Sequence, residues 1–220
     1  GVLVVSPIAP TLGTFTVPSK NYGDASFTLT APTSDSSGAF TYASSNTAVA
    51  TVTSSGGVVT VFTAGSTTIT ATQAASADGN YIAKDISGVL VVSPIAPSYQ
   101  SISQITKTYS TDVSFSLLSI MDGVSNSNGA YTFSSSSNAI DICGGIATIL
   151  AYTPSAITIT ASQAAFGNYT ASSKTFLLLV NRKTPSYGLF SIPAKTFGDA
   201  SFSVAPYAPT TDSLNVPFTY

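Results

Sequence analysis

Apolar and polar residues alternate along much of the chain, which is the pattern of β-strands that bury one face. In Ser26–Thr30 the side chains of Phe27 and Leu29 point one way and the hydroxyl-bearing residues point the other. Turn-forming residues interrupt this pattern about every 8 to 12 residues. The pattern predicts seven strands in the first part of the chain, near residues 12–17, 25–30, 39–43, 48–52, 57–63, 66–73 and 83–93. Seven short strands in a segment of this length favour a two-sheet sandwich.

Three sequence landmarks recur in the same order, which indicates an internal repeat. The recurring segments are Gly1–Pro10 with Gly88–Pro97, Lys20–Leu29 with Lys107–Leu117 and Lys195–Val204, and Ile69–Ala75 with Ile159–Ala165. The three lysines that open the second landmark are 87 and then 88 residues apart. The alternation keeps its phase, since Phe115 and Leu117, and then Phe202 and Val204, repeat the pattern of the first copy. We therefore predict an all-β chain of tandem two-sheet β-sandwiches with about seven strands each.

The prolines between the landmarks predict where the modules meet. We expect the last strand of a preceding module at 1–9, module 1 at 10–96, module 2 at 97–184 and the N-terminal part of an incomplete module 3 at 185–220. Proline removes a backbone donor and stiffens the chain, so the joints should be short and semi-rigid and the array rod-like. Both ends fall inside a module, which predicts an excerpt of a longer array. Donation of Gly1–Val5 to a neighbouring chain is the alternative, but one strand cannot replace four missing ones.

Composition narrows the classes of partner. Charged residues make up only 7% of the chain, so its solubility depends on 36 serines and 31 threonines, which suit strand faces and turns. The net charge of -2 provides no basic field for nucleic acid or an anionic membrane. The longest apolar run, Phe176–Val180, is far shorter than the roughly 20 residues of a membrane span. We expect no nucleic-acid partner and no membrane span in this segment.

The repeat resembles the bacterial immunoglobulin-like modules of invasin and intimin type, in particular group 2. The resemblance is carried by Ser45–Val52 (SNTAVATV), by Val59–Ala71 (VTVFTAGSTTITA) and by Asn80–Tyr81 before a strand that ends in Leu90–Val92. The second repeat keeps it more loosely, with Asn138–Ile142 in place of the central string. The motif around Lys195 is also similar to repeats in large structural proteins of giant algal DNA viruses. The resemblance implies a spacer, adhesive or virion-surface role and no catalytic residues.

Enzymatic chemistry has few suitable groups in this sequence. It contains no His, no Glu and one Cys, which excludes Ser–His–Asp and Cys–His machinery and transition-metal clusters. Asp24 and Asp199 recur in register, but each follows glycine in a turn motif that aspartate favours. Calcium needs only oxygen ligands, and Asp78, Asp85 and Asp122 are the candidates, yet no Asp-x-Asp-x-Asp loop occurs. We predict no catalytic, cofactor-binding or metal-binding residues.

The recurring lysines invite a comparison with the Lys–Asn isopeptide crosslinks of some surface adhesins. These lysines are Lys20, Lys107 and Lys195. Such a crosslink needs a buried lysine beside an asparagine and a carboxylic acid, whereas each lysine here lies in a polar stretch that is rich in turn residues. We therefore favour a non-crosslinked role.

Three further features have both an ordinary and a functional interpretation. Cys143 is the only cysteine, so it forms no intramolecular disulfide, and we expect a buried apolar role in preference to a reactive thiol. Asn168 begins a glycosylation sequon that the matching Asn80 lacks. Pairs of aromatic residues two positions apart should face the core, or a sugar or protein partner if they are exposed. They are Phe40 and Tyr42, Tyr131 and Phe133, and Phe218 and Tyr220.

Two functional hypotheses follow. The first is a non-catalytic structural protein of a virion surface, capsid-associated or fibre-like, or of a cell surface, which acts as a spacer and contacts neighbouring proteins or adjacent modules. The alternative is a bacterial-type adhesin module that binds a host glycan or receptor. Both place the protein outside the cell, on a virion or on a cell surface.

Overall fold

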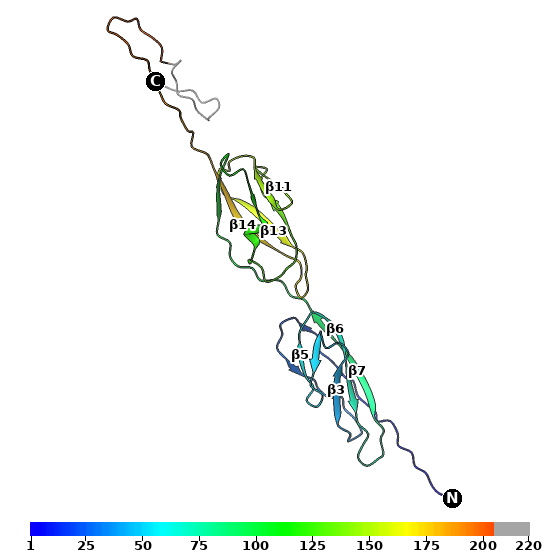
Figure 1. The fold of residues 1–220 in the computed structure, drawn as a ribbon. Helices are drawn as coiled ribbons and strands as arrows, with labels where there is room; N and C mark the ends of the chain where they lie inside the picture. Colours follow the sequence, from blue (N-terminus) through cyan, green and yellow to red (C-terminus); the bar gives the residue numbers. More distant parts are fainter. Residues whose placement is uncertain (205–220) are drawn as a thin grey trace. The chain divides into compact units, whose positions relative to one another are not determined.

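A computed structural model describes residues 1–204, and its regular secondary structure is almost entirely β-strand. The strands build two sandwiches, one from the first part of the chain and one from the second (Figure 1). The only helix within the described residues is α1 (Leu118–Met121), which has four residues. The all-β prediction and the prediction of immunoglobulin-like sandwiches are therefore confirmed.

The first sandwich contains seven strands in two sheets. They are β1 (Lys20–Asn21), β2 (Phe27–Thr28), β3 (Phe40–Ser44), β4 (Ala50–Val52), β5 (Val58–Val61), β6 (Gly65–Gln73) and β7 (Lys84–Ser93). One sheet has the order β1-β7-β6-β3 and the other has the order β2-β5-β4. The pairing of β1 with β7 is parallel, whereas β7 with β6, β6 with β3, and β5 with β2 and β4 are antiparallel.

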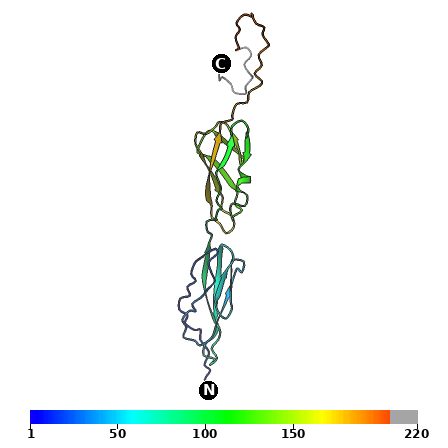
Figure 2. The same ribbon diagram turned by 90° about the vertical axis from the view of Figure 1, so that its left-hand side faces the viewer.

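The second sandwich repeats this arrangement strand for strand. Its strands are β8 (Ile105–Thr108), β9 (Ser114–Ser116), β10 (Tyr131–Ser135), β11 (Ile140–Cys143), β12 (Ile146–Ile149), β13 (Ile157–Gln163) and β14 (Ser172–Asn181). The sheet orders are β10-β13-β14-β8 and β11-β12-β9, and β8 pairs with β14 in parallel as β1 does with β7. Figure 2 shows the strands of each sandwich from a second direction. The sequence repeat is thus a repeat of topology.

The core of each sandwich follows the predicted alternation. In β7 the side chains of Leu90 and Val92 are buried, whereas the intervening Val89 and Val91 are exposed. The matching residues of β14, Leu178 and Val180, are fully buried. Three more fully buried apolar positions repeat, with Ile69, Ala71 and Val59 in the first core and Ile159, Ala161 and Ala147 in the second. Sequence phase therefore determines which side chains form the core.

The predicted strand at 12–17 is wrong. This segment makes only an isolated bridge, between Leu12 and Ser34, although Phe15 is buried in the core. It lies between Pro10 and Pro18, which cannot donate backbone hydrogen bonds. The first strand is instead β1, where the expectation was a turn-rich stretch.

The third copy of the lysine motif, residues 195–204, lies within the described part of the chain but forms no strand there. Its predicted strand phase at Phe202 and Val204 therefore does not appear in these residues. Phe218 and Tyr220, the third aromatic pair, lie outside the described residues.

Candidate interaction sites

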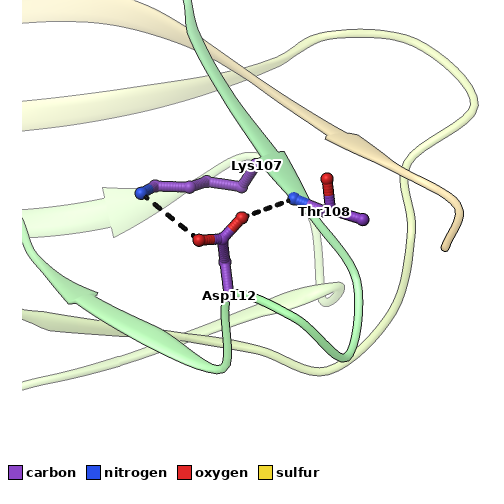
Figure 3. Close-up of polar contacts among 3 residues, drawn as sticks. All are labelled: Lys107, Thr108 and Asp112. Atoms are coloured by element: carbon purple, nitrogen blue, oxygen red, sulfur yellow. Dashed lines mark hydrogen bonds and ion pairs between the residues drawn. The ribbon is translucent and has the colours of Figure 1, made fainter.

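The recurring lysine motif forms a compact turn at the end of the first strand of each sandwich. In the second sandwich one carboxylate oxygen of Asp112 accepts the backbone N–H of Thr108 at 2.8 Å. The other oxygen lies 3.8 Å from Nζ of Lys107, as Figure 3 shows. The Lys107 ammonium also lies over the ring of Phe115, 5.1 Å from its centroid. In this turn Asp112 therefore accepts a backbone N–H, and Lys107 makes a cation–π contact with Phe115. A cation–π contact contributes about 0.5 to 1 kcal/mol at exposed sites.

The same turn is built in the other two copies. Asp24 accepts the backbone N–H of Asn21 at 2.8 Å, and Asp199 accepts that of Thr196 at 2.9 Å. The lysine–phenylalanine contacts recur as Lys20 with Phe27 at 4.6 Å and Lys195 with Phe202 at 4.8 Å. The structure therefore places Asp24 and Asp199 in the predicted turn. Asp112, the third member, was missed because its copy of the motif is one residue longer.

Two of the recurring lysines lie on strands, whereas the sequence analysis expected turn-rich stretches. Lys20 and Lys107 lie on strands β1 and β8 and not in turns. These strands pair in parallel with β7 and β14, which are distant in sequence, so local patterning does not reveal them. Each ammonium packs on a phenylalanine ring, and the carboxylate that Lys107 faces is a partly exposed turn residue.

Replacement of Ser110 by glycine is expected to stabilise the second sandwich by about 0.5 to 1 kcal/mol. Ser110 has a φ of 66° and is the only non-glycine residue with positive φ in the described chain, whereas the matching turn of the first sandwich has Gly23 with a φ of 86°. Denaturant unfolding should show a higher midpoint for Ser110→Gly than for the wild-type chain. Ser103→Gly, a matched change at an exposed serine without positive φ, should not raise the midpoint. An equal effect of both changes would contradict this account.

A buried glutamine closes one end of each sandwich. Nε2 of Gln73 donates to the carbonyls of Ser36 and Gly38 at 3.0 and 2.9 Å, and its Oε1 accepts the hydroxyl of Ser34 at 2.6 Å. Its side chain is almost completely buried, with 1% of the residue exposed. We call this arrangement the glutamine clamp.

The clamp recurs in the second sandwich. Nε2 of Gln163 donates to the carbonyls of Ser127 and Gly129 at 2.8 and 3.1 Å. Its Oε1 accepts the hydroxyls of Ser125 and Tyr99 at 2.8 and 3.2 Å. The sequence marks both glutamines as part of a landmark, but only the contacts reveal their role.

The remaining aspartates do not gather into a metal centre. In the described part of the chain, no three His, Cys, Asp or Glu side chains lie together as a metal site would require. Asp78 accepts hydrogen bonds from the Ser76 hydroxyl and from the backbone and side chain of Asn80, and these bonds lower its pKa. Asp85 and Asp122 are exposed. The structure therefore keeps the three calcium candidates apart.

Cys143 is exposed, so the prediction of a buried role is wrong. It is the last residue of β11 and shares the outward phase of Asp141, whereas Ile140 is buried. Asn168 is half-buried, and its backbone carbonyl accepts the N–H of Ile95 at 3.1 Å.

The aromatic pairs of the described residues turn toward the sandwiches. Tyr42 is buried and Phe40 packs against the same core, as predicted. Tyr131 and Phe133 are half-buried and stack on each other, with ring centroids 6.0 Å apart. Burial raises the pKa of the Tyr42 phenol and of the Tyr131 phenol.

The outward faces of the large sheets combine valine, leucine and threonine. Val89 and Val91 of β7 are 57% and 46% exposed, and they pair with Thr68 and Ser66 of β6. Leu177 of β14 is 45% exposed at the matching position of the second sandwich. Asp85, at the start of β7, adds one exposed carboxylate on the same side of the strand as the two valines. Within residues 1–204 no helix has the length and apolar character to cross a membrane.

Comparison with known protein families gives a match in one region of the chain. Residues 23–83 match the bacterial Ig-like domain (group 2). No curated protein matches the chain.

Several solved structures of adhesion and surface-layer proteins are similar at low identity. They include Drosophila N-cadherin EC1-4 (12% identity, 80% of this chain and 50% of that chain, TM-score 0.38), human protocadherin-24 EC1-2 (15%, 80% and 100%, 0.30) and the surface layer protein SbsC, domains 1-6 (12%, 94% and 32%, 0.29). The chain thus spans half the length of the N-cadherin structure, and the TM-scores are too low to support an argument about function. The family match does not depend on these structures, and the match of residues 23–83 to the bacterial Ig-like domain (group 2) agrees with the resemblance predicted from the repeat motifs.

Proposed function

We propose that this chain is a segment of a non-catalytic structural protein, whose Ig-like modules act as spacers and as protein–protein contacts on a virion or cell surface. The observation that carries the proposal is the repetition of one topology, with the same lysine turn and the same glutamine clamp in both sandwiches. A repeated module with repeated internal supports serves length and regular spacing better than a single specific reaction.

The module boundaries at 10–96 and 97–184, with a third module beginning at 185, are part of this proposal. So is a semi-rigid, rod-like arrangement, which the prolines near these boundaries favour. The exposed valine and leucine positions of the large sheets would contact protein neighbours in a capsid or surface layer.

Electron microscopy of chains that contain different numbers of these repeats tests the spacer role. We expect rows of beads whose number increases with the number of repeats, and in thin sections an antibody to this segment should label the virion or cell surface. Compact particles in which the repeats do not extend, or labelling confined to the cytoplasm, would overturn the proposal.

An adhesin module that binds a glycan is the second candidate. It is favoured by one specific feature of the second sandwich, a surface hollow beside α1. The geometry of this hollow supports a separate inference.

A further inference from the structure

The second sandwich contains a loop that is longer than its counterpart in the first. Leu117 and Gly129 are 12 positions apart, whereas the matching Leu29 and Gly38 are 9 apart. Both leucines are buried, and a Cβ atom at either glycine would meet a backbone carbonyl at 1.9 Å, so the ends of the two loops are equivalent. The three additional residues of the second loop accompany the short helix α1.

A hollow of 670 Å³ lies beside this helix. Its lining combines Leu118, Met121 and Tyr131 with the polar residues Asp122 and Asn128 and with serines. This volume is within the range of about 300 to 1,000 Å³ that is typical of small-molecule sites. The matching loop of the first sandwich is shorter and has no helix. The fold of the module therefore does not depend on the helix that lines this hollow.

Several polar groups of the hollow are available to a ligand. Among the described residues, Tyr131 Oη is buried and makes no hydrogen bond of ordinary geometry, and the nearby Ser125 hydroxyl, which lowers the pKa of Tyr131, donates to Gln163 Oε1. A buried polar group in this state costs about 1 to 3 kcal/mol, which a ligand acceptor would recover. The side chains of Asp122 and Asn128 are exposed, and neither is hydrogen-bonded within the described residues. They add acceptors and a pair of amide donors to the lining of the hollow.

The lining also excludes some classes of ligand. It contains no lysine and no arginine, and its one carboxylate would repel phosphate, sulfate and carboxylate groups. Apolar side chains beside uncharged donors and acceptors match a molecule that presents C–H faces and hydroxyl groups together. We propose that the hollow beside α1 binds a neutral saccharide, with Asp122 and Asn128 bonded to its hydroxyls and Tyr131 as hydrogen-bond donor at its base.

Backbone-amide NMR spectra of the whole chain test this proposal. The probes are glucose, galactose, mannose and N-acetylglucosamine at millimolar concentration, with glucose 6-phosphate as the charged comparison. At least one neutral sugar should shift the signals of residues 118–131 in a saturable manner, and the phosphate ester should bind more weakly. The Asp122→Ala/Asn128→Ala double variant should lose at least about tenfold in affinity, since two ligand hydrogen bonds are removed. Asp85→Ala, which removes an exposed carboxylate from β7, should leave the affinity unchanged.

Absence of any shift with all four neutral sugars would overturn the proposal. So would shifts of equal size in the double variant, or shifts distributed over both sandwiches. Because both substituted side chains are exposed, the double variant should keep the remaining spectrum of the wild-type chain. Failure here would leave the spacer role intact, since that role is decided by electron microscopy and not by sugar binding.

Discussion

Replacement of Gln163 by leucine is expected to lower the free energy of unfolding of the second sandwich by about 3 kcal/mol. Leucine is close to glutamine in size but cannot donate, so the carbonyls of Ser127 and Gly129 would lose the Nε2 donor that joins them. Each buried polar group that is left without a partner costs about 1 to 3 kcal/mol, and the apolar burial of leucine offsets part of this loss.

Denaturant unfolding, followed by NMR signals assigned to each sandwich, measures this change. Separate signals are needed because a chain of two modules does not unfold as one two-state system. Gln73→Leu should have a similar effect in the first sandwich, where the same clamp is present. Gln104→Leu is the matched control, since Gln104 is exposed, and it should change the stability by less than about 0.5 kcal/mol. Equal losses for Gln163→Leu and Gln104→Leu would show that the clamp does not support the fold.

The second large effect is expected from Gly129→Ala, which should destabilise the second sandwich by about 3 kcal/mol or prevent it from folding. The new Cβ would lie 1.9 Å from the carbonyl oxygen of Ala164, which is backbone and cannot turn aside as a side chain does. The strand end must then move, which disturbs the hydrogen bond from Ala164 N–H to Ala130 O at 2.9 Å and the adjacent Gln163.

A matched glycine distinguishes this steric effect from the general cost of an added methyl group. Gly56→Ala places its Cβ 3.2 Å from the hydroxyl of Thr53, which belongs to an exposed side chain and not to the backbone. Its cost should be below about 1 kcal/mol, whereas Gly38→Ala should repeat the effect of Gly129→Ala, because the same carbonyl contact at 1.9 Å occurs there. Thermal unfolding of the variants compares the changes, and a tolerated Gly129→Ala would show that the contact is not tight.

The parts of the fold that depend on local alternation were predictable from the sequence. The strands β3, β6 and β7 match the predicted segments within two residues at each end, because each buries every second side chain. The strand β1 was not predicted, because its two residues depend on a parallel partner more than 70 positions away. A pattern along the chain contains no direct signal for such a pairing.

The roles of individual residues were likewise predictable only where they depend on neighbouring residues in the sequence. The turn role of Asp24 followed from the residue type and its neighbours, whereas the exposure of Cys143 depended on the phase of a strand end that the preceding apolar residues obscured. The clamp of Gln163 requires knowledge of two carbonyls that lie more than 30 positions away in the chain. The hollow beside α1 was not predicted either, because it results from a three-residue difference between loops and not from a motif.

The most direct test of the central proposal, that this chain consists of tandem modules of one fold that act as spacers, is mechanical unfolding of the single chain from its two ends. We predict two separate events, each releasing about 87 residues, or roughly 270 Å of extended chain after the folded length is subtracted. A single event that releases both modules together, or extension without any resolved event, would contradict the account.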